Sequence, residues 1–218
     1  MVYNRAIPCL LLHKGGLYKT VQFKKHNYIG DPINAVKIFN EKEVDEIIFL
    51  DIDATVKKRE PDYGMIEDIA SECFMPLCYG GGIKTIDQMK RLFSLGIEKV
   101  SLSSIAVEKP DIVRDAAKIF GSQSIVVTVD VKKSKFGSMN VFTHNGKIKT
   151  GFKPVDFVKY MEEMGAGEIV VNSIDNDGMM KGYDLELLKM ITTSVNIPVV
   201  ALGGAGTLED LGSAINQG

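Results

Sequence analysis

The stretch at residues 79–83, YGGGI, returns near the end of the chain at residues 202–206 as LGGAG. An Asp-x-Asp turn precedes each of them, at residues 51–53 and again at residues 175–177, and the two pairs of motifs are separated by nearly the same distance. Motifs that recur in the same order and spacing indicate an internal repeat. The chain is therefore predicted to contain two copies of one structural half.

Apolar runs alternate with helix-period segments along the chain. Runs such as EIIFLDI and SIVVTVD are rich in Val and Ile throughout, as strands buried on both faces of a parallel sheet are. The sequence predicts seven strands, near residues 6–12, 46–51, 76–79, 99–102, 124–130, 168–172 and 197–202. It predicts seven helices, at about 31–42, 61–73, 85–95, 110–119, 153–164, 184–192 and 207–217, with hairpin-like insertions around 13–23 and 132–150.

Seven βα units without a linker leave two architectures, an open doubly wound sheet and a β/α barrel. The repeat favours the barrel, because two (βα)4 halves close into a (βα)8 TIM barrel. We predict an α/β fold, with one TIM-barrel domain over residues 1–218 and half-barrels at about 1–122 and 123–218. The eighth unit is absent from this sequence, and we expect a missing segment of roughly thirty residues, since such barrels are about 250 residues long.

The composition, 45% hydrophobic and 25% charged, is that of an ordinary globular protein and excludes disordered, collagen-like and disulfide-scaffold classes. A net charge of -2 gives no general attraction to nucleic acid or anionic membranes. No apolar run is long enough to span a bilayer, and the N-terminus does not have the pattern of a signal peptide. Three cysteines suit reduced thiols. We expect a cytoplasmic protein without nucleic-acid or membrane partners.

Both glycine turns are candidate phosphate sites, because bare backbone N–H groups can approach an anion near a helix N-terminus. One such turn would more simply be a tight connection. Two turns at repeat-related positions instead predict a phosphorylated small-molecule substrate with a phosphate at each end. The predicted phosphate-binding residues are Gly81, Gly82, Ser103, Ser104, Asp177, Gly178, Gly203 and Gly204.

Three residues are candidates for catalysis. Asp130 ends the run SIVVTVD, where a barrel commonly carries an acid or base. Asp51 ends a strand in the first half, although helix capping or loop hydrogen bonding explains it equally well. Lys19 lies in the first insertion and could contact a phosphate, or it is a solvated loop lysine. The repeat places the counterpart of Asp130 at Leu11, so the expected second carboxylate is absent.

The three histidines show neither metal-ligand spacing nor a serine or cysteine partner motif. We predict that His13, His26 and His144 are loop histidines. The sequence therefore predicts no metal, no nucleophilic triad and no cofactor.

Longer motifs carry a family resemblance. They are RAIPCL, FLDI, YGGGI, VEKPDIV, FGSQSIVV, NGKIKTG, MGAGEIVVNSIDNDG, GYD and ALGGAG. Along its whole length the chain resembles the cyclase subunit of imidazole glycerol phosphate synthase, the HisF family. The resemblance implies a TIM barrel and a lyase-type, ammonia-dependent reaction, with ammonia supplied by a HisH-like glutaminase and passed through the barrel core. It also implies Asp130 as acid/base and phosphate binding at Gly82, Ser103, Ser104, Gly203 and Gly204.

The family's ring of charged residues at the barrel floor matches Arg5, Glu46, Lys99 and Glu168. Buried charges at strand beginnings must pair, so a structural salt-bridge layer is one interpretation. Two acidic and two basic side chains also form a neutral cluster, which could open without leaving one buried charge unpaired. We therefore expect these residues to gate ammonia.

Three departures from the family bear on function. Leu11 stands where the family has an essential aspartate, Asn172 where it has a threonine, and Ser103 where it has an asparagine. Leucine cannot exchange protons, and losing one member of an acid–base pair costs about 10²–10⁴ in rate. This combination, and the stretch CLLLHKGGLYKT, resemble a paralogous branch from surface-polysaccharide gene sets. That branch is associated with converting a sugar N-acetyl group into an acetamidino group, beside a glutaminase and a sugar amidotransferase.

Three functions follow as hypotheses. The first is an ammonia-handling subunit that supports sugar amidation. The second is a true histidine-pathway cyclase, in which Asp51 or Asp53 replaces the acid missing at Leu11. The third is a non-catalytic scaffold that recruits a glutaminase and an amidotransferase. A sister isomerase of the same pathway is disfavoured, because it needs no ammonia gate and uses a first-strand carboxylate.

Overall fold

The computed structural model describes residues 4–217, which fall into two compact units. Unit 1 contains the described residues up to Lys19 and residues 27–102. Unit 2 contains residues 20–26 and those from Ser103 onward. The short segment 20–26 therefore belongs to the second unit although its flanking residues belong to the first.

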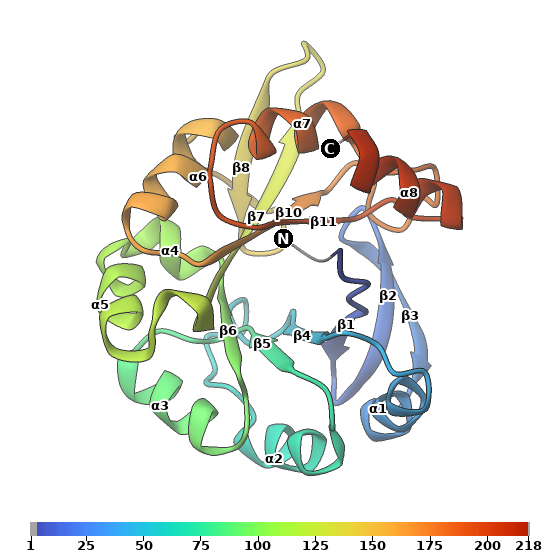
Figure 1. The fold of residues 1–218 in the computed structure, drawn as a ribbon, viewed down its shortest axis with the longest axis vertical. Helices are drawn as coiled ribbons and strands as arrows, with labels where there is room; N and C mark the ends of the chain where they lie inside the picture. The colour runs from blue at the N-terminus through green and yellow to red at the C-terminus, as the bar shows by residue number, and fades with distance from the viewer. Residues whose placement is uncertain (1–3, 218) are drawn as a thin grey trace. The chain divides into compact units, whose positions relative to one another are not determined.

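Unit 1 is built on four parallel strands, which lie in the order β6-β5-β4-β1. They are β1 (Cys9–His13), β4 (Ile47–Asp51), β5 (Leu77–Gly80) and β6 (Lys99–Leu102). The helices α1 (Pro32–Glu41), α2 (Tyr63–Glu72) and α3 (Ile86–Ser94) lie along one side of these strands (Figure 1). Each helix begins at a side chain, Asp31, Asp62 or Thr85, that accepts a hydrogen bond from a first-turn N–H.

Side chains alternate between the two faces of the unit 1 strands. Leu10, Phe49 and Tyr79 are register neighbours and are almost fully buried, and Tyr79 lies close enough to Asp62 and Tyr63 of the α2 region to interact with them electrostatically. This face is therefore the helix-covered one. The other face carries Cys9, Leu11 and His13 of β1 and their register neighbours.

The first insertion forms two antiparallel strands that follow β1. Strand β2 (Gly16–Val21) pairs with β1 through a turn at Lys14 and Gly15, both of which have positive φ. Strand β3 (Lys24–Gly30) lies beyond β2. The sequence did not predict β3, because nearly all of its side chains are exposed and no apolar alternation marks it.

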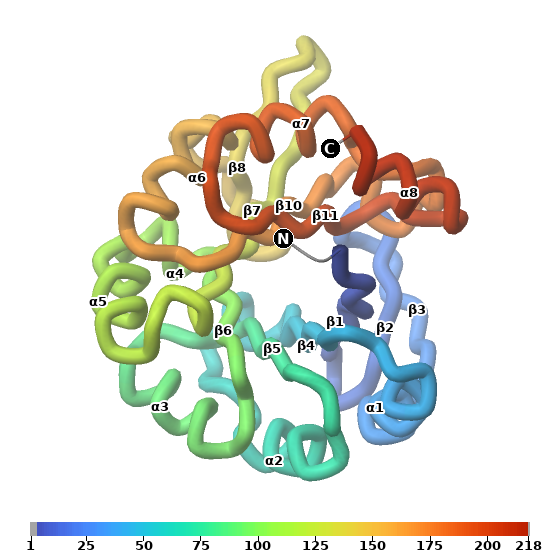
Figure 2. The backbone as a smooth tube through the Cα atoms, in the orientation of Figure 1, coloured from blue at the N-terminus to red at the C-terminus, as the bar shows by residue number. Residues whose placement is uncertain are grey.

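Unit 2 contains three parallel strands in the order β11-β10-β7. They are β7 (Ile125–Lys133), β10 (Glu168–Ser173) and β11 (Val199–Leu202). Their helices are α4 (Ser104–Glu108), α5 (Asp111–Phe120), α6 (Pro154–Glu163), α7 (Leu185–Thr192) and α8 (Leu208–Gln217), with a 3₁₀ turn at Ser122–Ser124. Strand β7 continues into a hairpin with β8 (Met139–Thr143), which β9 (Ile148–Lys149) extends and whose tip reaches away from the unit (Figure 2).

The predicted α/β fold class of TIM-barrel type is confirmed. All seven predicted parallel strands and all seven predicted helices are present in the described part of the chain, with ends displaced by a few residues. Helix α4 was not predicted, because it is a single short turn directly after β6. The two contact units divide at residue 102, whereas the predicted half-barrels divide at about 122, so the single-domain organisation over 1–218 stays a prediction.

Candidate active site

Asp130 and Asn172 form the centre of a candidate site in unit 2. They are register partners on β7 and β10, so their side chains lie on the same face. The Asn172 Nδ2 donates a hydrogen bond to Asp130 Oδ1 at 3.0 Å. The sequence predicted Asp130 at the end of its strand. In the structure it lies inside β7, because the strand continues to Lys133 and into the β7–β8 hairpin.

The environment of Asp130 places its titration near neutral pH. Burial raises the pKa of Asp130, hydrogen bonds from Asn172 and Ser103 lower it and the Asp177 carboxylate raises it, so that the pKa is about 7. A carboxyl with such a pKa can both donate and accept a proton under cellular conditions. Asp130 therefore has the properties of an acid/base group, and the Ser103 side chain is close enough to donate a hydrogen bond to it.

Asn172 was noted in the sequence only as a departure from a family threonine. In the structure its Oδ1 is buried and has no hydrogen-bond partner among the described residues. A β-carbon at Gly203 would lie 2.9 Å from this oxygen, so glycine is needed at that position to leave room for the amide. A buried carbonyl oxygen without a donor is costly, and a ligand N–H or O–H would satisfy it.

Asp177 and Gly178 hold the segment 20–26 against the loop after β10. The Asp177 Oδ2 accepts hydrogen bonds from Thr20 Oγ1 at 2.7 Å and from Phe23 N at 3.1 Å. Gly178 has φ +66, and a β-carbon there would lie 2.0 Å from Thr20 O. Both residues therefore have a structural role, and phosphate binding by them stays a prediction.

The glycine turn after β11 is equally constrained. Gly203 and Gly204 have φ values of +87 and +115, and a β-carbon on Gly204 would lie 2.2 Å from Gly182 O. Backbone packing thus accounts for both glycines. Ser104 Oγ accepts a hydrogen bond from His144 N at 3.2 Å, whereas the Ser103 side chain makes no capping bond at the start of α4. Phosphate binding at these four positions stays a prediction.

The corresponding turn in unit 1 follows β5. Gly81 has φ +116, and a β-carbon there would lie 2.4 Å from Asp51 O. Gly82 has φ +74, and its N–H donates to Thr55 Oγ1 at 3.3 Å. The turn is therefore tied to the loop after β4, and its phosphate role is also untested.

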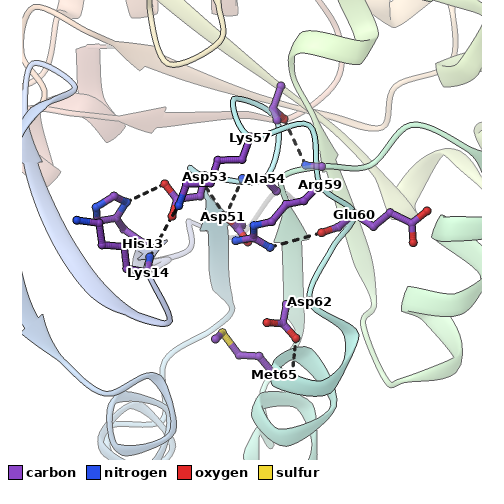
Figure 3. Close-up of polar contacts among 12 residues, drawn as sticks. His13, Lys14, Asp51, Asp53, Ala54, Lys57, Arg59, Glu60, Asp62 and Met65 are labelled. Carbon is purple, nitrogen blue, oxygen red and sulfur yellow. Dashed lines mark hydrogen bonds and ion pairs between the residues drawn. The ribbon is translucent and has the colours of Figure 1, made fainter.

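Asp51 lies at the end of β4 in a closed network (Figure 3). Its Oδ1 accepts from the backbone N–H groups of Asp53 and Ala54 at 2.9 and 3.0 Å, and its Oδ2 accepts from Arg59 Nη2 at 2.6 Å. Burial raises the pKa of Asp51, although Arg59 opposes this. Its register partner is Leu12, which places Asp51 on the helix-covered face. This geometry suits an organiser of the loop, and the predicted catalytic role stays a prediction.

Asp53 joins three groups on the neighbouring part of this loop (Figure 3). Its Oδ1 lies 2.8 Å from His13 Nδ1, while its Oδ2 accepts from Lys57 Nζ at 2.8 Å and from Lys14 N at 3.0 Å. Burial would raise the pKa of Asp53, but the hydrogen bonds from Lys57, Lys14 and His13 lower it to about 2. Asp53 is therefore an ionised carboxylate with its orientation fixed.

The prediction that the histidines lie in loops is wrong for two of them. His13 is the last residue of β1 and His26 lies within β3, whereas His144 does lie in the turn after β8. His13 was missed as a site residue because Asp53 is 40 positions away in the sequence, so no local motif marks the pair.

Leu11 lies in an apolar layer of unit 1. Its register partners are Tyr18 on β2 and Leu50 on β4. A β-carbon on Gly80 would lie 2.8 Å from Leu50 Cδ2, so the leucine side chain covers that glycine. Lys19 lies in β2 with its side chain exposed, not in a loop. Neither of these two register partners of Leu11 carries a carboxylate.

Three of the four predicted gate residues meet in unit 1. The Glu46 Oε2 accepts from Arg5 Nη1 at 2.6 Å and from Lys99 Nζ at 2.7 Å. Glu46 is only 3% exposed, which is tolerable for a charge because two cations pair with it. The fourth residue, Glu168, is the buried first residue of β10 in unit 2.

Two features are absent from residues 4–217. No three or more His, Cys, Asp or Glu side chains are grouped so that they could hold a metal ion. Within the same residues, no helix is long and apolar enough to cross a membrane.

Comparisons with known proteins agree with this architecture. The family described as histidine biosynthesis protein matches residues 5–218. A protein of Vibrio vulnificus with the provisional name imidazole glycerol phosphate synthase subunit hisF3 is 54% identical over 218 residues, which is 100% of this chain and 84% of the relative. A protein of Leptospira interrogans, provisionally named as the HisF subunit, is 51% identical over 218 residues, with 100% and 86% covered. The imidazole glycerol phosphate synthase subunit HisF of Alkaliphilus metalliredigens is 41% identical over the same length and coverage.

A family match over almost the whole chain and relatives of this similarity leave no ambiguity about descent. The chain belongs to the histidine biosynthesis protein family, as a member of its HisF type.

Proposed function

We propose that this HisF-type chain accepts ammonia from a HisH-like glutaminase partner and uses it to support amidation of a sugar, forming an acetamidino group. A sugar amidotransferase would act with it. The observation that carries this proposal is the residue at position 11. Leu11 pairs in register with Tyr18 and Leu50, at the position where the family resemblance implies a catalytic aspartate, and Arg5, Glu46 and Lys99 form the cluster that the resemblance implies for ammonia entry.

The charged cluster supports ammonia entry at the strand beginnings. One Glu46 oxygen binds both Arg5 and Lys99, so a rotation of either cation would open the cluster and still leave the carboxylate with one partner. Buried charges are tolerated in such paired sets and are costly when stranded. The proposal also includes Glu168, whose burial at the start of β10 suits the same role.

A second candidate function is the cyclase reaction of histidine biosynthesis. It is favoured by Asp130, whose pKa of about 7 suits an acid/base group, and by the named function of the Alkaliphilus relative. A non-catalytic scaffold is a third possibility. It would bind the partners without any need for the glycine turns.

The deciding experiment uses the full-length protein with the cyclase substrate and saturating ammonium salt, so that no glutaminase is required. Product formation is compared for wild type and Leu11→Asp. We expect wild type to be at least about 10²-fold slower than Leu11→Asp, because one member of the acid–base pair is missing. Robust wild-type turnover would refute the amidation proposal and establish the cyclase. Inactivity of both proteins would indicate that the chain uses another substrate, and sugar acceptors would then be assayed.

A further inference from the structure

His13 lies on the same face of β1 as Leu11. Side chains alternate along a strand, so Cys9, Leu11 and His13 share one face, and the buried Leu10 and Leu12 share the helix-covered face. Two residues along a strand correspond to about 7 Å. His13 is therefore the next side chain after Leu11 on this face of β1, toward the carboxyl end of the strand.

Asp53 fixes the orientation and the tautomer of His13. The 2.8 Å contact joins His13 Nδ1 to an ionised carboxylate, so the Nδ1 carries the hydrogen and donates it. In the neutral ring Nε2 is then the basic nitrogen. Lys57 Nζ and Lys14 N hold the other carboxylate oxygen, and Tyr18 contacts the imidazole edge-on at a centroid distance of 4.8 Å. A carboxylate bound to one ring nitrogen of a histidine fixes the orientation and tautomer of the ring, as in a catalytic triad.

The face that carries Leu11 and His13 also carries Glu46, which binds Arg5 and Lys99 at the strand beginnings. On β4, Glu46, Ile48 and Leu50 alternate onto the face of Cys9 and Leu11, as the register pairs Cys9–Ile48 and Leu11–Leu50 require. This face of unit 1 therefore carries Glu46 at the strand beginnings, then Leu11, and then His13 toward the strand ends.

We propose that His13, oriented by Asp53, is the acid–base group of this strand end and performs the proton transfer that Leu11 cannot. The inference rests on the proposed function. When ammonia adds to the carbonyl carbon of the sugar N-acetyl group, its nitrogen becomes cationic and the carbonyl oxygen anionic. His13 Nε2 takes a proton from that nitrogen and the imidazolium gives it to the oxygen. A second such transfer lets the C–O bond break with the oxygen leaving as water, so that amide and ammonia become amidine and water. The imidazole is thereby regenerated, and Asp53 acts as a positioning residue. The simpler alternative is a structural hydrogen bond that fastens β1 to the loop after β4.

The test uses extract from a strain in which the gene is deleted, to which purified full-length protein is added back. Amidine formation on the sugar is measured by mass spectrometry, with glutamine or with ammonium chloride as the nitrogen source. If glutamine-driven amidation proceeds without added protein, the proposed function fails. If the protein is required with glutamine but dispensable with ammonium, it only delivers ammonia, so the proposed function stands and the His13 proposal is overturned.

The variants separate catalysis from structure. With ammonium chloride, His13→Gln should lower the maximal rate by about 10²–10⁴-fold with the half-saturating ammonium concentration unchanged. Added imidazole should restore part of the rate to His13→Ala. His144→Gln, a change at a partly exposed turn histidine, is the matched control and should keep the wild-type rate.

Two results would contradict the proposal. One is a His13→Gln protein that keeps its Tm and retains its rate within about threefold, far less than the loss of an acid–base group produces. The other is a loss of rate that imidazole does not restore and that shifts the ammonium dependence, which is the behaviour of a structural contact. If the variants do not fold, nitrogen NMR of histidine-labelled wild type decides: a His13 with hydrogen on Nδ1 supports the pairing, and one with hydrogen only on Nε2 refutes it.

Discussion

Asp130 should lower the stability of the folded protein as pH rises, and Asp130→Asn should abolish this effect. The folded-state pKa is about 7, whereas an unfolded aspartate titrates near 3.8. Between these values the unfolded chain has released a proton that the folded protein retains. Stability is therefore greatest below the unfolded pKa and falls until pH passes the folded pKa.

The size of the effect follows from the width of this window. One pKa unit corresponds to about 1.4 kcal/mol, so the rise from about pH 5.5 to about pH 8.5, well past the folded pKa, should cost about 2 kcal/mol of unfolding free energy. Solvent reaches part of the Asp130 residue, so this figure is an upper value. In Asp130→Asn the Asn172 amide can still meet an oxygen, and no ionisation remains.

The assay is urea unfolding of wild type and Asp130→Asn at several pH values from about 5.5 to 8.5, because the difference between the proteins cancels the other titrating groups. The variant should gain about 2 kcal/mol relative to wild type across this range. Asp115→Asn, at an exposed carboxylate of α5, is the control and should stay within about 0.5 kcal/mol. Parallel curves for wild type and Asp130→Asn would refute a raised pKa and, with it, the acid/base assignment of Asp130.

Three further predictions concern single contacts. Glu46→Gln leaves Arg5 and Lys99 without their shared carboxylate oxygen and should cost about 3 kcal/mol in urea unfolding, with a loss below about 1 kcal/mol showing that the cluster is not formed. Asp53→Asn should lose about 2 kcal/mol of unfolding free energy above pH 4, because the pKa of Asp53 is lowered to about 2 in the folded protein. This difference from wild type should disappear as pH falls from about 4 to about 2. A difference that does not change with pH in the same denaturant titration would contradict the lowered pKa. Gly178→Ala, whose β-carbon would meet Thr20 O, should lower Tm, whereas Gly212→Ala, which has open space within helix α8, should raise it slightly; equal Tm values would argue against the contact with segment 20–26.

Much of the fold could be predicted from sequence because local chemistry specifies it. Apolar runs such as SIVVTVD and EIVVN can be buried only as interior strands, and Asp31, Asp62 and Thr85 mark helix beginnings by their ability to accept first-turn hydrogen bonds. Strand β3 escaped prediction, since its exposed side chains leave no hydrophobic pattern. The repeat and the long motifs determined the barrel type and the family, and the substitution at Leu11 was visible without any coordinates.

Tertiary structure alone decided which groups meet. Asp130 and Asn172 pair because β7 and β10 align in register, and Asp177 binds Thr20 across 157 residues because the segment 20–26 folds onto unit 2. His13 and Asp53 meet only because β1 and β4 are adjacent and the loop after β4 turns back. Sequence determines the character of each side chain through local pattern, whereas the meeting of distant side chains depends on strand register and loop path, which no local pattern encodes.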